Sequence, residues 1–155
     1  MLPASDNETN TVNATLRKFG YPASLIREYT SWVVMIRPKQ ITLGCAIIAA
    51  KSACASLGGL TPREAAELPE VIRDFEAAVK NTAEAVKFNY LALMMVDPNP
   101  HFHAIPRYAE PVTLDGQVFI DASFPNAPDL HSVHELDSAE LQRLKARLMA
   151  GWLAP

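Results

Sequence analysis

The sequence has little of what would place the protein outside the ordinary globular class. Only 2 of its 155 residues are cysteines, too few for a disulfide framework, so we expect a reducing, cytoplasmic environment. The longest strongly apolar run, residues 43–50, is far shorter than the ~20 residues that a membrane-spanning helix needs. The first residues include Asp6 and Glu8 and no apolar segment, which argues against a secretory signal. A net charge of −3 argues against a nucleic-acid partner.

The remaining composition is that of one folded domain. Hydrophobic residues make up 49% of the chain and charged residues 20%, which excludes global disorder. Residues 1–15 are polar and show no apolar period, so we expect a mobile N-terminal arm there. A single domain should follow over residues 16–155.

Hydrophobic periodicity predicts an α+β domain with an antiparallel sheet of about five strands. Thr61 and Glu64 predict the capped start of a long helix that ends near Lys87, between two groups of strands. Asp137 predicts a capped C-terminal helix in the same way. The expected strands cover residues 24–29, 32–36, 41–49, 88–96, 101–108 and 118–120.

The segment 97–108 carries the side chains best suited to chemistry. Alternate side chains of a strand share a face, so His101 and His103 should project to the same side, about 6.6 Å apart. Asn99 falls on that side too if the strand geometry begins that early. We expect His101 to be an exposed strand residue.

The spacing of these two histidines leaves three interpretations open. They could be hydrogen-bonded surface residues. They could be metal ligands, with His131 or His134 as the third ligand that such a site needs. They could also be a catalytic pair, because imidazole titrates near neutrality and serves as nucleophile or acid.

The stretch from Phe88 to Tyr108 resembles the signature segment of the histidine triad (HIT) family, in which three histidines alternate with apolar residues and Pro-Arg commonly follows. The segment from Trp32 to Cys45 resembles the sheet-entry segment of a bacterial subgroup described as diadenosine-tetraphosphate-hydrolase-like. One helix separates the two blocks, as in that family. The resemblance covers roughly residues 21–129 and implies a HIT-like domain that forms a symmetric homodimer.

The resemblance implies a nucleotide hydrolase or transferase that cleaves a phosphoanhydride or related bond at the α-phosphorus. The middle position of the motif falls on His101, which would attack phosphorus and form a nucleotidyl-histidine. The third position falls on His103, which would donate a hydrogen bond to a phosphate or leaving-group oxygen. Asn89 and Arg107 would bind substrate phosphate. The chemistry needs no metal or other cofactor, and the small-molecule partner is a nucleotide.

The sequence departs from this family at the first triad position. Asn99 replaces the histidine, Pro100 follows it, and Cys45 stands where many members have a supporting histidine. Asn-Pro-His is similar to the His-Pro-His segment of galactose-1-phosphate uridylyltransferases. The resemblance implies that the backbone carbonyl of Asn99 still holds the inner nitrogen of His101. The alternatives are a catalytically weakened nucleotide-binding protein and a HIT-fold enzyme repurposed for another substrate.

Several of these residues also have a plain structural interpretation. Met94 and Met95 suit core filling on a buried strand. Arg37 and Lys39 suit surface charges in a loop. Arg107 suits a solvated charge at a strand end, and Asn89 suits a strand-edge side chain that bonds local backbone.

Overall fold

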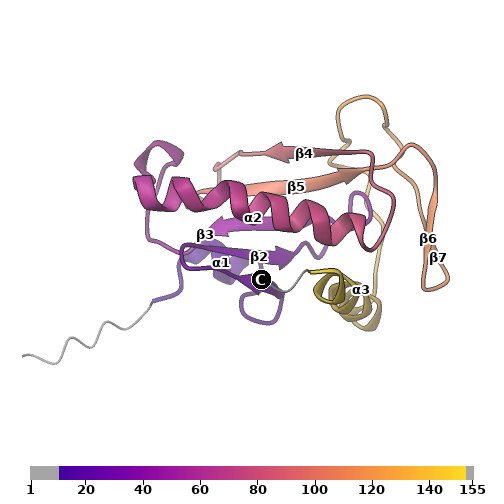
Figure 1. Cartoon of the computed structure of the whole chain (residues 1–155), viewed down its shortest axis with the longest axis horizontal. Coiled ribbons are helices and arrows are strands. Elements are labelled where there is room, and N and C mark those ends of the chain that lie inside the picture. Colours follow the sequence, from indigo (N-terminus) through magenta and orange to yellow (C-terminus); the bar gives the residue numbers. More distant parts are fainter. Residues whose placement is uncertain (1–10, 153–155) are drawn as a thin grey trace, which may run out of the picture.

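The computed structural model describes residues 11–152 and contains a five-stranded antiparallel sheet in the order β1-β2-β3-β5-β4. A separate hairpin, β6-β7, lies beyond one end of it (Figure 1). The prediction of an α+β domain with a five-stranded sheet, one long helix between strand groups and a C-terminal helix is confirmed. The elements are α1 (Ala14–Lys18), β1 (Leu25–Glu28), β2 (Trp32–Ile36), β3 (Ala46–Ala50), the 3-10 turn η1 (Leu57–Gly59), α2 (Pro62–Lys80), β4 (Lys87–Leu91), β5 (His101–Arg107), β6 (Val112–Leu114), β7 (Gln117–Phe119) and α3 (Ser138–Gly151).

Both faces of the sheet are covered, and the central strands β2 and β3 are buried along their whole length. Helix α2 lies along one face and α1 lies on the other (Figure 1). Alternation along β2 assigns its side chains to the two faces, because successive residues of a strand point in opposite directions. Trp32, Val34 and Ile36 pack into the core that contains residues of α2 and α3. Val33 and Met35 pack into the smaller core under α1.

The two longer helices begin where capping residues were predicted. The Thr61 hydroxyl accepts a hydrogen bond from the Glu64 N–H, while the Glu64 carboxylate accepts one from the Thr61 N–H. Asp137 forms the equivalent capping box at the start of α3. Helix α2 ends at Lys80, seven residues before the predicted end near Lys87, because Lys87 already pairs with β5 as the first residue of β4. No helix within residues 11–152 is long and apolar enough to cross a membrane.

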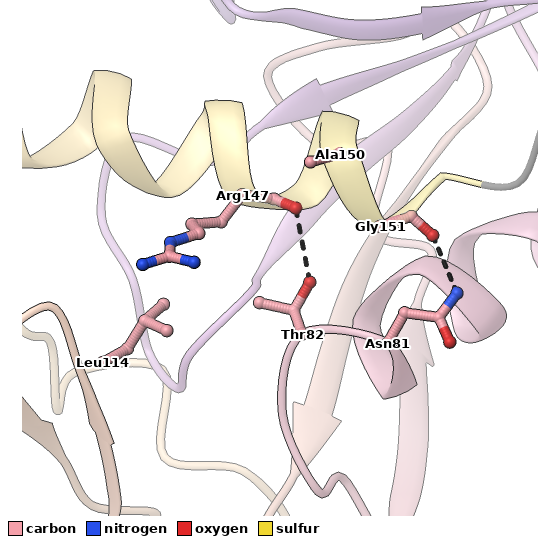
Figure 2. A pocket seen from close by; sticks show the side chains of 6 residues that line it. All are labelled: Asn81, Thr82, Leu114, Arg147, Ala150 and Gly151. Carbon is pink, nitrogen blue, oxygen red and sulfur yellow. Dashed lines mark hydrogen bonds between the residues drawn. The ribbon is translucent and has the colours of Figure 1, made fainter.

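The C-terminal ends of α2 and α3 meet at a close contact (Figure 2). The Asn81 amide donates to the Gly151 carbonyl at 2.9 Å, and a Cβ atom on Gly151 would lie 2.6 Å from the Ala78 carbonyl oxygen. Glycine is therefore required at position 151 for the two helix ends to approach. The cavity beside this contact, of about 310 Å³, contains no histidine and lies apart from the residues discussed below.

The strand expected over residues 41–49 begins only at Ala46, because a buried turn precedes it. The Gln40 side chain organises this turn: its Oε1 accepts from the N–H groups of Gly44 and Cys45, each at 2.9 Å. Its Nε2 donates to the carbonyls of Arg37 and Cys45. Gly44 adopts a φ of 88°, a conformation that favours glycine. The turn fixes the loop that carries Arg37 at the edge of the α1 face.

The strand expected over residues 88–96 ends at Leu91, where it pairs with His103. The interpretation of Met94 and Met95 as core filling is wrong, since the Met95 side chain is 85% exposed and Met94 has a positive φ of 39°. Strand β5 begins at His101, which the register places opposite Leu93, so the residues from Met94 onward have no β5 residue to pair with. They form the loop that leads into the histidine segment.

Candidate active site

Strand β5 places the two histidines on one face of the sheet, as their spacing predicts. His101 pairs with Ala49 of β3 and His103 with Ile47, and both of these partners belong to the core under α1. The two imidazole rings lie 5.3 Å apart between centroids. Phe102, between them, points to the opposite face and packs against the larger core. The prediction that His101 is exposed is wrong: only 2% of its surface is accessible.

A backbone hydrogen bond orients the His101 ring. Its Nδ1 lies 2.8 Å from the carbonyl oxygen of Asn99. A carbonyl oxygen only accepts, so Nδ1 carries the hydrogen and the neutral ring presents Nε2 with a free lone pair. The intervening Pro100 does not weaken the sheet here, because its carbonyl accepts from the Ala50 N–H at 2.9 Å. The backbone arrangement that the resemblance implies is therefore present.

The Asn99 side chain is buried and bonds to segments that sequence reasoning did not connect with it. Its Oδ1 accepts from the Thr15 hydroxyl at 2.9 Å, and its Nδ2 donates to the Cys54 carbonyl at 2.8 Å. The expectation that Cys45 takes the supporting position is wrong, because the β3–β5 register pairs the neighbouring Ala46 with Ala104, five residues beyond Asn99. Asn99 is thus supported by α1 and by the loop after β3.

Helix α1 covers the face that carries the histidines. Asn13 caps it by accepting from the Leu16 N–H, and its amide donates to the carbonyls of Ala50 and Ser52. Leu16 is buried against strands β2 and β3. The arm expected over residues 1–15 therefore does not extend through Asn13–Thr15, which belong to the folded domain, and residues 1–10 lie outside the described residues. Asn13 as a helix cap and Gly20 after the helix end are the sequence signals that would have identified α1.

Phe19, directly after α1, packs against both imidazoles. Its ring centroid lies 5.6 Å from that of His101 and 5.9 Å from that of His103. Sequence reasoning missed Phe19, and no local pattern distinguishes it from an ordinary core aromatic residue.

His103 lies in an environment that disfavours its protonated form. Burial first, and then the charges of Arg37 and Lys18 and the neighbouring His101 ring, together lower the pKa of His103 to about 4, although Asp97 acts to raise it. Lys18 and Asp97 form an ion pair of 2.7 Å. His103 is therefore neutral at pH 7 and offers a hydrogen-bond donor without a net charge.

Arg107 and Asn89, predicted to bind substrate, bond to each other, and no hydrogen bond of the described residues joins either of them to a histidine. Arg107 lies four residues along β5 from His103 and six from His101, about 13 Å and about 20 Å away at the rise of a strand. Its guanidinium forms a bidentate ion pair with Asp121, and it also donates to the Asn89 side chain at 2.7 Å. The alternative of a solvated strand-end charge is wrong, because Arg107 is buried.

The Arg107 cluster holds the chain after β7 against the sheet. Arg107 Nη2, which bonds to Asp121, is also within hydrogen-bond distance of the Ser123 hydroxyl and the Asn126 carbonyl. Burial acts to raise the pKa of Asp121, but its hydrogen bond and charge interaction with Arg107 outweigh this, so the pKa is lowered overall. Asp121 thus remains a carboxylate paired with Arg107, and the cluster stabilises the fold.

The other two histidines lie away from the pair. The His134 ring contacts the backbone of Ile120, and the backbone N–H of His134 donates to the Gln40 carbonyl. The His131 backbone N–H bonds to the side chain of Asp129. Within residues 11–152, no three histidine, cysteine, aspartate or glutamate side chains form a group that could hold a metal ion.

Comparison with known proteins identifies the fold. No protein-family model matches the chain, and no curated protein matches it in sequence. Among solved structures, a histidine triad protein from Sinorhizobium meliloti 1021 is similar, with a TM-score of 0.70 at 20% identity over 92% of this chain and 97% of that one. A histidine triad protein from Bradyrhizobium japonicum gives a TM-score of 0.69 at 18% identity, over 92% and 98% of the two chains.

A more distant similarity reaches an archaeal protein. A hypothetical histidine triad nucleotide-binding protein from Sulfolobus tokodaii strain7 gives a TM-score of 0.59 at 16% identity, covering 83% of this chain and 82% of that one. At these identities the similarity concerns the fold. The chain described here has the fold of the histidine triad proteins.

Proposed function

We propose that this chain belongs to the histidine triad family and is a nucleotide hydrolase or transferase that acts at the α-phosphorus of its substrate. The Nε2 lone pair of His101 attacks phosphorus, and a P–N bond forms as the bond from phosphorus to the leaving group breaks. Water, or another acceptor, then attacks the nucleotidyl-histidine. The P–N bond breaks, the nucleoside monophosphate leaves, and His101 returns to its neutral form after the water proton passes to solvent.

The observation that carries this proposal is the hydrogen bond of 2.8 Å between His101 Nδ1 and the Asn99 carbonyl. It keeps the lone pair on Nε2, the atom that must attack, without requiring a histidine side chain at position 99. Asn99 supplies this bond through its backbone, so its side chain is free to hold α1. The nucleophile position is therefore intact although the triad is incomplete.

His103 would stabilise charge that develops on the phosphate oxygens. Its ring lies 5.3 Å from that of His101 on the same face, within reach of a group bound to His101 Nε2. Because its pKa is lowered to about 4 by burial and nearby charge, it acts as a neutral N–H donor at pH 7. A polyphosphate leaving group departs as an anion, so the first step needs no proton.

The test is to incubate the protein with dinucleoside polyphosphates and adenosine 5′-phosphoramidate and to follow release of the monophosphate. The acid-labile nucleotidyl-histidine should accumulate after a rapid quench and should be absent in His101→Ala. A matched control is His134→Ala, which removes a ring that lies away from the site. Monophosphate release by His101→Ala at the wild-type rate would refute the mechanism.

A second candidate is a nucleotide-binding protein with weakened catalysis. Burial of His101 beneath Phe19 favours this alternative, because substrate must displace or bypass the ring to reach Nε2. Calorimetric binding of a nucleotide without any monophosphate release would favour it over the hydrolase.

We also propose that the protein forms a homodimer. Strand β4 is an edge of the sheet, and Leu93, Met95 and Val96 in the loop after it are exposed apolar residues. An exposed edge beside apolar side chains favours pairing with a second chain. Light scattering should give twice the monomer mass of 17.0 kDa. A monomer over a wide concentration range would contradict the proposal.

A further inference from the structure

A group of cationic residues borders the histidine site. A cavity of about 290 Å³ is lined by Lys18, Phe19, Arg37, Pro38 and Lys39. Phe19, on its wall, is the ring that packs against both imidazoles. The cavity, here named the cationic pocket, therefore shares the Phe19 ring with the histidine pair.

The charges of the cationic pocket are poorly compensated by the protein. Lys18 pairs with Asp97, but the ion pairs formed within residues 11–152 include no carboxylate partner for Arg37 or Lys39. Arg37 is half-buried, and its guanidinium donates to the backbone carbonyl of Lys39. Burial lowers the pKa of Arg37, as expected for a cation held partly out of water. Three cations against one carboxylate make this the place where an anion would be bound.

The cationic pocket is also electrostatically coupled to the site. Arg37 and Lys18 both act on the pKa of His103 through their charges. Phe19 lines the cationic pocket and its ring centroid lies 5.9 Å from that of His103, so a ligand in the cationic pocket would lie close to His103. A molecule bound to His101 could extend into the cationic pocket without leaving the sheet face.

We propose that Arg37 and Lys39, with Lys18, bind an anionic group of the substrate that is distinct from the phosphate attacked by His101. This inference rests on the proposed function and narrows it. The preferred substrate carries at least two phosphate groups, as a nucleoside polyphosphate does. A nucleotide whose leaving group is neutral would leave the cationic pocket unused. Arg37 and Lys39, taken for plain surface charges from the sequence, become determinants of substrate choice.

The first experiment measures binding without turnover. Inorganic tripolyphosphate is titrated into the full-length protein by calorimetry at low salt, with Arg37→Gln/Lys39→Gln as the test variant. The control is Arg63→Gln/Arg73→Gln, which removes the same charge from exposed positions on α2, on the other face of the sheet. We expect the test variant to bind about tenfold or more weakly and the control to stay within about twofold of wild type. Equal binding by the test variant, or an equal loss in the control, would overturn the inference.

The second experiment measures substrate choice. The ratio of kcat/KM for diadenosine tetraphosphate to kcat/KM for adenosine 5′-phosphoramidate is compared between wild type and the test variant. We expect this ratio to fall about tenfold or more, because only the tetraphosphate places a further phosphate in the cationic pocket. An unchanged ratio would overturn the inference while leaving the hydrolase intact.

The two experiments separate this inference from the proposed function. If wild type cleaves neither compound, the hydrolase proposal fails, whereas tripolyphosphate binding still decides whether the cationic pocket binds anions. If the double variant does not fold, Lys39→Glu alone replaces it, since Lys39 is exposed. The same losses are then expected from the reversed charge.

Discussion

Replacing Asn99 with alanine separates the role of its side chain, which holds α1, from the role of its backbone carbonyl, which orients His101. The side chain receives the Thr15 hydroxyl at 2.9 Å and the Thr15 N–H at 3.4 Å, and it donates to the Cys54 carbonyl at 2.8 Å. Alanine leaves these buried groups without a partner, which costs roughly 1–3 kcal/mol for each unsatisfied group before any relaxation. Because α1 can shift to admit water, we expect a total loss of about 2–4 kcal/mol in the free energy of unfolding.

The catalytic cost of the same substitution should be smaller than the stability cost suggests. Alanine keeps the backbone carbonyl that binds His101 Nδ1 at 2.8 Å, so the nucleophile keeps its tautomer. We expect kcat/KM for Asn99→Ala to stay within about two orders of magnitude of wild type, against a loss of many thousandfold for His101→Ala. The residual loss comes from the loosened α1 and Phe19.

Stability is measured by urea unfolding. Monophosphate release is measured under conditions in which the variant is folded. Thr15→Val is the matched control, because it breaks the same contact from the α1 side without touching the histidine segment. It should lose about 1–2 kcal/mol of stability. A folded Asn99→Ala that is as inactive as His101→Ala would mean that the Asn99 side chain acts on the substrate. Unchanged stability would mean that α1 is not held by this contact in solution.

Three further predictions concern the same residues and the Arg107 cluster. His101→Ala should abolish turnover and, because the ring is buried under Phe19, should also lower the free energy of unfolding by about 1–2 kcal/mol, measured in urea. Burial lowers the pKa of His103 from 6.5 to about 4, so in this range the unfolded chain binds the proton more readily, and stability should fall as pH decreases between these values. After allowance for solvent screening the fall is on the order of 1–3 kcal/mol, and His103→Phe should abolish it; a pH-independent wild type would contradict the argument. Asp121→Asn should lower stability by about 3–5 kcal/mol, since it leaves the buried Arg107 without its ion pair, and a loss below about 1 kcal/mol in thermal unfolding would show that the ion pair is not buried in solution.

The parts of the site that sequence reasoning captured are those determined within one strand. The shared face of His101 and His103 follows from the period of two residues in a strand, and the Asn99 carbonyl follows from its place two residues before His101. Capping boxes at Thr61 and Asp137 were equally visible, because their partners lie three residues away. Local spacing fixes these features without reference to the rest of the chain.

The parts that were missed depend on contacts between distant segments. Thr15 and Asn99 are 84 positions apart in the sequence, and no local pattern in the polar N-terminal stretch predicts their hydrogen bond. Arg107 was misjudged because its carboxylate, Asp121, lies beyond a hairpin in the sequence. The apolar residues before Met95 have the pattern of a strand. Strand β5 begins only at His101, however, and does not extend far enough to pair with Met95. In each case tertiary pairing overrode a local pattern.

Helix α1 has a consequence for how the protein opens. It contains five residues, fewer than an isolated helix needs to be stable in water, so its persistence depends on docking through Leu16, Thr15 and its Asn13 cap. Such a segment detaches at a lower free energy than the strands beneath it, which are bonded to neighbours on both sides. Local detachment of α1 and Phe19 would uncover His101 while the five-stranded sheet stays folded. If the proposed function holds, a nucleotide would reach His101 through a segment less stable than the strands beneath it, and access to the site would depend on a local unfolding equilibrium.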